Sequence, residues 1–380
     1  MSDVSPKKFD LPHLGDELLW KIFVKSDPKT VGRCRSLNRV WSYRLSTPLF
    51  VKQNFRENKD KDGSVIIGIG YPPTDENSQW FVRADVETGR QFHFGVPMQI
   101  NHFGYYSLVG DDHGNLCIRL SYGGLNSRII IWNPLTRDIR YISDEASKHC
   151  CHAVSLYAFG YLQDQTEYRI VHVYKRHYAE KNMKWTLFNS IQRDWVHSGT
   201  FQSNVHKLGP KPIVQEGVVS WIGWEGVNNS DPAAIITFSL QQRKFSEDIV
   251  PEDVKASYHA LIQINDNVGF MSYKNLCFTR QVSVWGLKRS ANDKHIWEKM
   301  VKVTGLGMPY SPTLFVDKDV ITLMEARTGF GTSNDGERTD ILLSRLKYMH
   351  QIRKHLVHRT WNEAVSVKSV SLHSNGLYMV

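Results

Sequence analysis

The chain has 380 residues, 41% of them hydrophobic, which is enough apolar material for one large or two ordinary domains. Its net charge of +9 is spread among interspersed acidic residues, so we expect no nucleic-acid partner and interpret the densest basic stretch, 345–359, as a solvated face. No run of 18 apolar residues and no leader with a cleavage site occur, so we expect no membrane contact and no secretion.

The first fifty residues predict three short helices. Apolar residues recur at a helical period in three groups: Leu18, Leu19, Ile22 and Phe23; Val31, Cys34 and Leu37; Val40, Trp41 and Leu45. Asp16 is the expected cap of the first helix, and Asp27 before Pro28 predicts the second start, because proline at the first helical position loses no hydrogen bond. Thr47 and Pro48 should then end the helical run.

A helical module of about fifty residues buries little surface by itself. Apolar side chains beyond its own core then need another surface to cover them, which indicates a docking module. The charged segment 54–63 marks its end. We therefore expect a disordered tail at 1–9, the docking module at 10–56, a linker at 57–63 and a second domain at 64–380.

The second domain is predicted to be β. Short β-branched and aromatic runs alternate with turn residues, at 64–67, 115–120, 128–132, 168–174, 217–222, 234–238 and 281–285. A weak repeat is marked by tryptophans expected to pack between sheets: Trp132, Trp185, Trp195, Trp221, Trp285 and Trp297. Blades of ~40–50 residues would give six or seven blades of a propeller, with a pair of β-sandwiches as the alternative. The polar stretch 326–340 is expected to be a loop that makes the last blade irregular.

Catalytic and metal-binding motifs are missing from the sequence. The glycine pairs at 68–70 and 329–331 lead into no helix, so we interpret them as turns rather than phosphate-binding loops. No Gly-x-Ser-x-Gly elbow occurs. Cys150 and Cys151, within 149–152, would face opposite sides of a strand and have no Cys-x-x-Cys partner. We expect no enzyme activity, no cofactor and no metal. Five irregularly spaced cysteines also argue against a disulfide framework and predict the cytoplasm and/or nucleus.

Four segments in order resemble the F-box: Leu11-Pro12, 16–23, 27–41 and 48–50. Residues 13–15 are an insertion relative to that family. The rest of the chain resembles the propeller-like F-box-associated domain of the large plant F-box families. The segments that carry this resemblance are 110–117, the Trp-Asn-Pro turn at 131–137, 159–161 with 167–171, 217–221, 236–245 and 282–285. Ser220 stands where that family often has His. The expected fold is thus mainly β with a small all-α N-terminal module, a three-helix F-box followed by a β-propeller-like domain.

The resemblance implies a substrate-recognition subunit of a Skp–cullin–F-box ubiquitin ligase. The F-box would bind the Skp-family adaptor and through it a cullin, and the β domain would recruit an unknown target protein for ubiquitination. The implied adaptor contacts are Leu11, Pro12, Leu18, Ile22, Leu37 and Trp41. Trp41 is the expected anchor because buried tryptophans dominate hot spots. Two alternatives stay open: these side chains fill only the module's own core, or the β domain is a non-ligase scaffold or glycan-binding module.

Overall fold

The computed structural model describes a helical segment, 14–58, and most of the chain that follows it. The described ranges beyond 58 are 65–71, 80–85, 91–95, 104–122, 126–133, 138–144, 154–162, 167–177, 180, 182–209, 211–225, 232, 234–250, 258–264, 267–276, 279–289, 295–306, 313–317, 320–329, 338–347, 356–360 and 366–373.

The N-terminal module consists of α1 (Asp16–Lys25), α2 (Pro28–Arg35), α3 (Arg39–Arg44) and α4 (Pro48–Asn58). The predicted number of helices is therefore wrong. The helical run was expected to end at Thr47 and Pro48, but the proline at the first helical position starts a fourth helix, in which Phe50 is buried. No helix in the described part of the chain is long and apolar enough to cross a membrane.

The two predicted caps differ in outcome. Asp27 is confirmed as a cap, since its carboxylate accepts a hydrogen bond from the Thr30 N–H at 2.9 Å. Asp16 is wrong as a cap: Gly15 occupies the N-cap position and makes no side-chain bond. Asp16 lies in the first turn of α1, where its carboxylate pairs with Arg44 of α3 at 2.8 Å.

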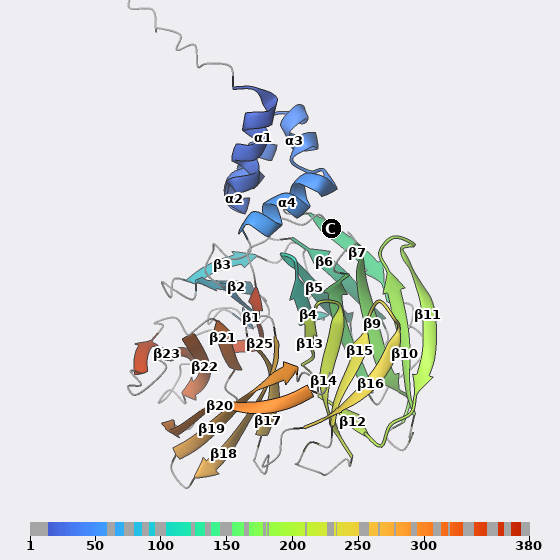
Figure 1. Ribbon diagram of the computed structural model, residues 1–380, viewed down its shortest axis with the longest axis vertical. Coiled ribbons are helices and arrows are strands. Elements are labelled where there is room, and N and C mark those ends of the chain that lie inside the picture. Colours follow the sequence, from blue (N-terminus) through green and yellow to red (C-terminus); the bar gives the residue numbers. More distant parts are fainter. Residues whose placement is uncertain are drawn as a thin grey trace, which may run out of the picture.

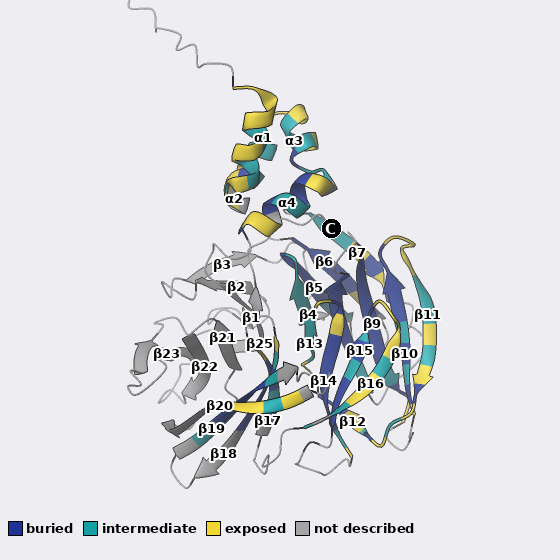
Figure 2. Ribbon diagram, in the orientation of Figure 1, coloured by how far each residue is buried: buried dark blue, intermediate teal, exposed yellow. Residues whose placement is uncertain are grey.

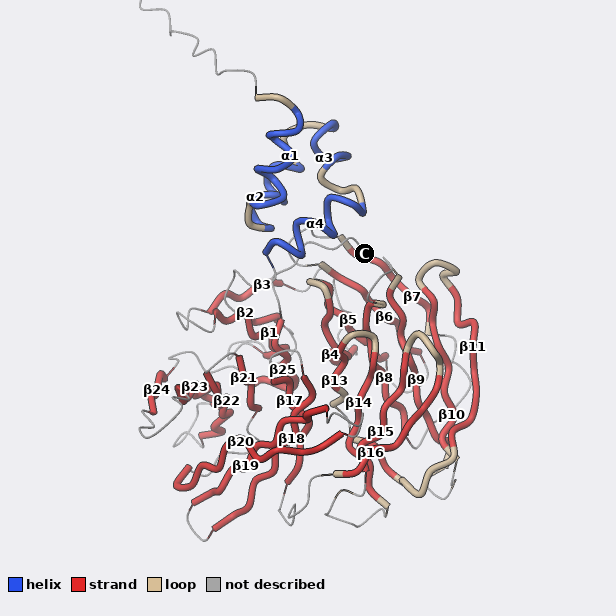
Figure 3. The backbone as a smooth tube through the Cα atoms, viewed as in Figure 1, coloured by secondary structure: helices blue, strands red, loops and turns tan. Residues whose placement is uncertain are grey.

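The described remainder of the chain is almost entirely strand and turn, as Figure 3 shows. Its strands form five sheets. The first sheet, in spatial order, contains β25 (Ser366–His373), β1 (Val65–Tyr71), β2 (Trp80–Asp85) and β3 (Gln91–Gly95). The second contains β4 (Gly104–Asp112), β5 (Asn115–Tyr122), β6 (Asn126–Trp132) and β7 (Ile139–Ser143). The third contains β11 (Asp194–Phe201), β10 (Met183–Asn189), β9 (Tyr168–Lys175) and β8 (Val154–Tyr161).

The two remaining sheets are larger. The fourth contains β12 (Lys207–Leu208) and β13 (Ile213–Gln215), both paired with β14 (Val218–Trp224), then β15 (Ala234–Ser239) and β16 (Lys244–Ile249). The fifth has eight strands: β20 (His295–Leu306), β19 (Thr279–Arg289), β18 (Asn267–Leu276), β17 (Tyr258–Ile264), β21 (Thr313–Asp317), β22 (Val320–Gly329), β23 (Arg338–Lys347) and β24 (Leu356–Thr360).

Neighbouring strands pair antiparallel except β17 and β21, which share one parallel bridge, Ile264 to Val316. The chain closes on itself because β25, the last strand, pairs with β1, the first. The sheets stand around a common centre below the helices (Figure 1). This arrangement confirms a mainly β, propeller-like domain behind a small helical module.

The seven predicted β runs coincide with β1, β5, β6, β9, β14, β15 and β19. One predicted turn is wrong: residues 68–70 lie inside β1, whose pairing with β25 shifts register between Ile69 and Gly70. The predicted loop at 326–340 is wrong at its two ends, since 326–329 belong to β22 and 338–340 to β23, which pair from Ala326–Ile341 to Gly329–Arg338. Residues 330–337 lie outside the described residues.

Five of the six tryptophans of the repeat pack between sheets, as predicted, and the sixth, Trp132, is buried at 6% exposure. Trp185 and Trp221 belong to one core cluster, Trp285 to another, and Trp195 and Trp297 pack against these cores. At one sheet boundary a glycine is required: a Cβ on Gly160 would lie 2.5 Å from Cγ1 of Val214. Figure 2 shows the buried interior strands β9, β10 and β14.

The helical module is seated on the β domain through α4. Val51 of α4 is 2% exposed and belongs to the core cluster of the second and third sheets, together with Ile129 and Ile142. Arg35 at the end of α2 also forms an ion pair with Asp138, just before β7, with 3.6 Å between Nη1 and Oδ2. The β domain thus supplies part of the cover that a small helical module needs.

Candidate protein-docking surface

The core of the helical module is filled by a few residues from different helices. Val31, Leu45 and Phe50 are fully buried. Trp20 packs edge-on against Phe50 at 5.1 Å between ring centroids, and its Nε1 donates to the Gln53 side chain at 3.0 Å. The module therefore has a closed core before any partner binds.

Two buried asparagines hold the end of α1. Nδ2 of Asn54 donates to the carbonyl oxygens of Phe23, Val24 and Ser26 at 2.9–3.1 Å. Nδ2 of Asn58 donates to Val24 and Ser26 at 3.2 and 3.0 Å. Carbonyls at a helix C-terminus lack partners within the helix, and these amides satisfy them from α4. The position of α1, and of the residues it exposes, therefore depends on α4.

The opposite face of α1 carries apolar side chains in solvent. Leu18 and Ile22, one helical turn apart, are 49% and 45% exposed, and Leu14 just before the helix is 42% exposed. Figure 2 shows much of α1 in yellow, the colour of exposed residues. A second exposed set follows α2 and continues along α3: Leu37, Val40 and Tyr43, which are 70%, 59% and 77% exposed. Large side chains at such exposure have little contact within the chain and are free to bind a partner.

The predicted contact residues are placed as follows. Leu18, Ile22 and Leu37 point outward, so they do not fill the module's own core. Trp41 is half-buried instead: its ring packs on Phe23 at 4.9 Å and lies under the Arg44 guanidinium at 5.6 Å. Leu11 and Pro12 lie outside the described residues. The sequence analysis missed Leu14, Val40 and Tyr43 as candidates, although their apolar character beside the predicted helices was the available signal.

Charged residues flank the exposed apolar set. Glu17 pairs with Lys21 at 3.0 Å, and this hydrogen bond and the charge of Lys21 lower the pKa of the Glu17 carboxyl. Both side chains are largely solvated, so the pair contributes little to stability. The surface is thus an apolar patch with a polar rim, the usual composition of a protein-docking site.

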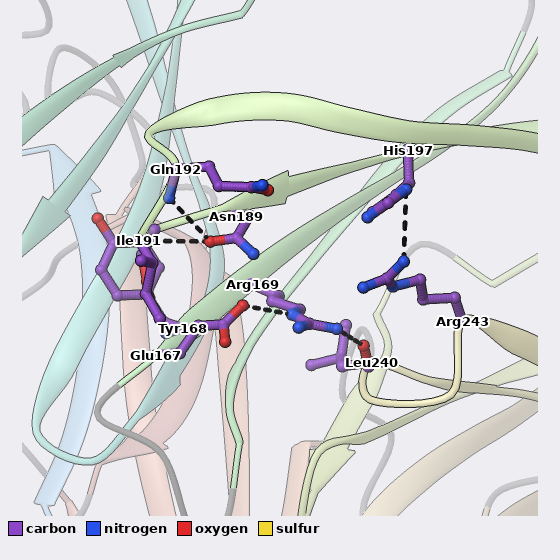
Figure 4. A network of polar contacts seen from close by, with 10 residues as sticks. Glu167, Tyr168, Arg169, Asn189, Ile191, Gln192, His197, Leu240 and Arg243 are labelled. Carbon is purple, nitrogen blue, oxygen red and sulfur yellow. Dashed lines mark hydrogen bonds and ion pairs between the residues drawn. The ribbon is translucent and has the colours of Figure 1, made fainter.

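Neighbouring sheets of the β domain are joined by polar contacts, one of them buried and one exposed. Arg169 of β9 lies between the Glu167 carboxylate, at 2.7 Å from its Nε, and the Leu240 carbonyl of the next sheet (Figure 4). The same view shows His197 of β11 facing Arg243, 3.5 Å from Nδ1 to Nη1. Partial burial and the charges of Arg243 and Arg169 hold the pKa of His197 below its usual value. These contacts fix the relative positions of adjacent sheets.

The described residues contain no group of three or more His, Cys, Asp or Glu that could hold a metal ion. The segment 149–152 lies outside the residues that the structure describes. Cys34 is partly exposed and Cys117 is buried, and both are free thiols.

A comparison with family models matches residues 114–370 to the F-box associated beta propeller domain. The match covers more than half of the chain. The chain belongs to the F-box associated beta propeller domain family. The matched region runs from the start of β5 into β25, so it includes strands of all five sheets. The family thereby supports a protein-interaction role for the β domain, and the helical module precedes the matched region.

Among curated proteins the search finds no match. Among solved structures, the SapL1 lectin in complex with alpha methyl fucoside is similar at a TM-score of 0.41 and 9% identity, covering 79% of this chain and 96% of that one. A putative 6-phosphogluconolactonase from Bacteroides fragilis is similar at 0.40 and 9%, covering 82% and 99%. YjhT is similar at 0.39 and 11%, covering 71% and 94%. None of these likenesses carries a functional argument.

Proposed function

We propose that the chain is the substrate-recognition subunit of a Skp–cullin–F-box ubiquitin ligase and has no catalytic site of its own. In this proposal the helical module is the F-box, it binds a Skp-family adaptor and through it a cullin, and the β domain recruits a target protein. The observation that carries the proposal is the exposed apolar set of Leu18, Ile22 and Leu37 on a module whose core is already closed. That module precedes a domain of the F-box associated family.

The exposed set suits a protein groove better than another surface. Leu18 and Ile22 follow the one-turn spacing with which an amphipathic helix enters a partner's groove. The module is also anchored on the β domain through Val51 and Arg35, so an adaptor bound at the helices would be held at a defined position relative to any target on the sheets. Such an arrangement suits a receptor, because holding the target at a set position relative to the adaptor favours the transfer of ubiquitin to it.

The sheets support a count of six blades. The first four sheets are one blade each, with β12 and β13 sharing one edge of β14. The eight-stranded sheet divides at the single parallel bridge between β17 and β21 into two antiparallel blades of four strands. Irregularly spaced cysteines and the free thiols of Cys34 and Cys117 support a reducing compartment, the cytoplasm or nucleus.

Co-expression with a Skp-family adaptor, followed by size-exclusion chromatography, tests the proposal. We expect a one-to-one complex that Leu37→Ser weakens about tenfold, because Leu37 is 70% exposed and its loss leaves the module's core unchanged. Ile191→Ser is the matched control, since Ile191 is 69% exposed but lies between β10 and β11. Trp41→Ala is a weaker test because Trp41 also packs on Phe23.

A failure to bind the adaptor with the sheets intact would reject the F-box proposal. Equal weakening by Leu37→Ser and Ile191→Ser would reject the specific surface. In either case the β domain would have to work as a scaffold without the ligase.

A further inference from the structure

A groove of about 390 Å³ lies between β7 and the hairpin that joins β10 to β11. Arg140 and Tyr141 of β7 line one side, and Arg193 and Trp195 of the hairpin line the other. Tyr168, only 2% exposed, forms part of its inner wall. None of these residues belongs to the docking surface of the helical module.

The hairpin side of the groove is rigid. Oδ1 of Asn189 accepts hydrogen bonds from the backbone N–H groups of Ile191 and Gln192 at 2.8 and 3.1 Å (Figure 4). The Arg193 N–H donates to the Asn189 carbonyl at 2.8 Å, and Arg193 has a left-handed φ of 58°. Nε1 of Trp195 then donates across the groove to the Ser143 carbonyl at 2.9 Å. The arginine is therefore presented from a turn that is already ordered, which lowers the entropy lost on binding.

The inner wall ends in a buried hydroxyl. Burial raises the pKa of the Tyr168 hydroxyl, whereas the charge of Arg140, a hydrogen bond with Arg140 and the charge of Arg193 lower it. A hydroxyl that accepts from Arg140 still has its own O–H to donate, so it can also serve an acceptor on a ligand.

The charge of the groove favours an anion. Two arginines and one carboxylate, Asp194, are among the residues that line it, and that carboxylate already accepts a hydrogen bond from the Trp195 N–H at 2.7 Å. Among the described residues Arg193 has no ion-pair partner. A guanidinium binds a carboxylate through two parallel hydrogen bonds, the strongest polar contact that a side chain of this kind offers.

We propose that this groove binds an acidic peptide segment of a partner protein, with one carboxylate held by Arg193, Arg140 and the Tyr168 hydroxyl. The aromatic and apolar lining favours a peptide over a nucleic acid: Tyr141 is 50% exposed, and Ile142 and Trp195 also line the groove. Two arginines around one small groove are also too few for a phosphate backbone, which needs an extended basic stripe. Only the identification of the partner as a ligase target rests on the proposed function.

The groove can be tested by panning random peptides of about twelve residues on phage against the full chain. We expect the selected peptides to be enriched in Asp and Glu beside an apolar residue. Fluorescence anisotropy of the best peptide should show about tenfold weaker binding to Arg193→Asn, the loss expected for one charge-assisted hydrogen bond. Asparagine is chosen because it tolerates the left-handed backbone of this position.

Arg243→Asn is the matched control. Arg243 occupies the same position of the next hairpin, with φ 59° and a 2.8 Å bond from its N–H to the Ser239 carbonyl, and its loss removes the same charge away from the groove. Tyr168→Phe should also weaken binding severalfold and leaves the ring's packing in place.

Enrichment that disappears on Arg193→Asn but persists on Arg243→Asn supports the proposal. Equal losses in the two variants would mean non-specific charge attraction and overturn it. Selection of no peptide, selection without acidic enrichment, or displacement of the peptide by single-stranded DNA at equal concentration would overturn it as well. Adaptor binding, measured separately, stays informative in every case, because the groove is not part of the helical surface.

Discussion

Replacing Asn54 by alanine is predicted to release α1 from the rest of the helical module. Its buried amide donates to the carbonyls of Phe23, Val24 and Ser26, and no other side chain donates to Phe23 among the bonds described. Asn58 continues to serve Val24 and Ser26 in the variant. The loss is therefore one to two hydrogen bonds of about 1 kcal/mol each, with a small cavity, or about 2 kcal/mol in all.

Hydrogen exchange of the α1 amides measures this locally. A loss of about 2 kcal/mol raises the open population about thirtyfold, so α1 amides should exchange about thirtyfold faster while those of β9 and β14 stay unchanged. Glu57→Ala is the control, since Glu57 is exposed on the same helix. Adding Asn58→Ala should cost more than the two single changes together, because the asparagines share acceptors. Unchanged α1 exchange in the Asn54 variant would refute the assigned role.

Three further predictions concern the β domain. Arg169→Met should lower the free energy of unfolding by about 3 kcal/mol in urea titrations, because it leaves the Glu167 carboxylate buried and unpaired, and adding Glu167→Gln should recover part of the loss. Gly160→Ala should cost about 1–3 kcal/mol in the same titration, since the added Cβ would meet a valine methyl at 2.5 Å, and an unchanged midpoint would contradict this packing. Burial raises the pKa of the Cys117 thiol, so raising the pH to 9 should leave it unreactive to iodoacetamide in the folded protein while partly exposed Cys34 is alkylated, as read by peptide mass mapping.

Local signals in the sequence were sufficient for most elements. The Asp27-Pro28 pair predicted the start of α2 correctly, because capping and the fixed φ of proline act within a few residues. The β-branched runs predicted strands correctly because strand preference is also a property of neighbouring residues. The predicted cap at Asp16 was wrong because its carboxylate forms an ion pair with Arg44. Arg44 lies on another helix, so a local sequence pattern cannot show this contact.

The parts of the candidate sites that depend on distant residues could not be predicted. Asn54 in α4 completes α1, and Val51 in the same helix joins the core of the β domain. Neither residue has a sequence signature for such a role, since Asn54 opens a charged segment and Val51 is one of several apolar residues before it. The groove likewise combines Arg140 and Arg193 from different sheets, so only the folded chain brings them together.

The repeated hairpin explains how similar turns give one binding groove and one structural contact. Arg193 and Arg243 share left-handed φ values and the same backbone bond, so the two turns have the same backbone conformation. Their surroundings are set by the preceding sheet: Arg243 meets His197 of β11, whereas Arg193 faces a groove lined by β7. The neighbouring outer strand therefore determines what each turn arginine contacts. Introducing a carboxylate on β7 by Tyr141→Glu should close the groove to acidic peptides, because it would supply Arg193 with a partner from within the chain.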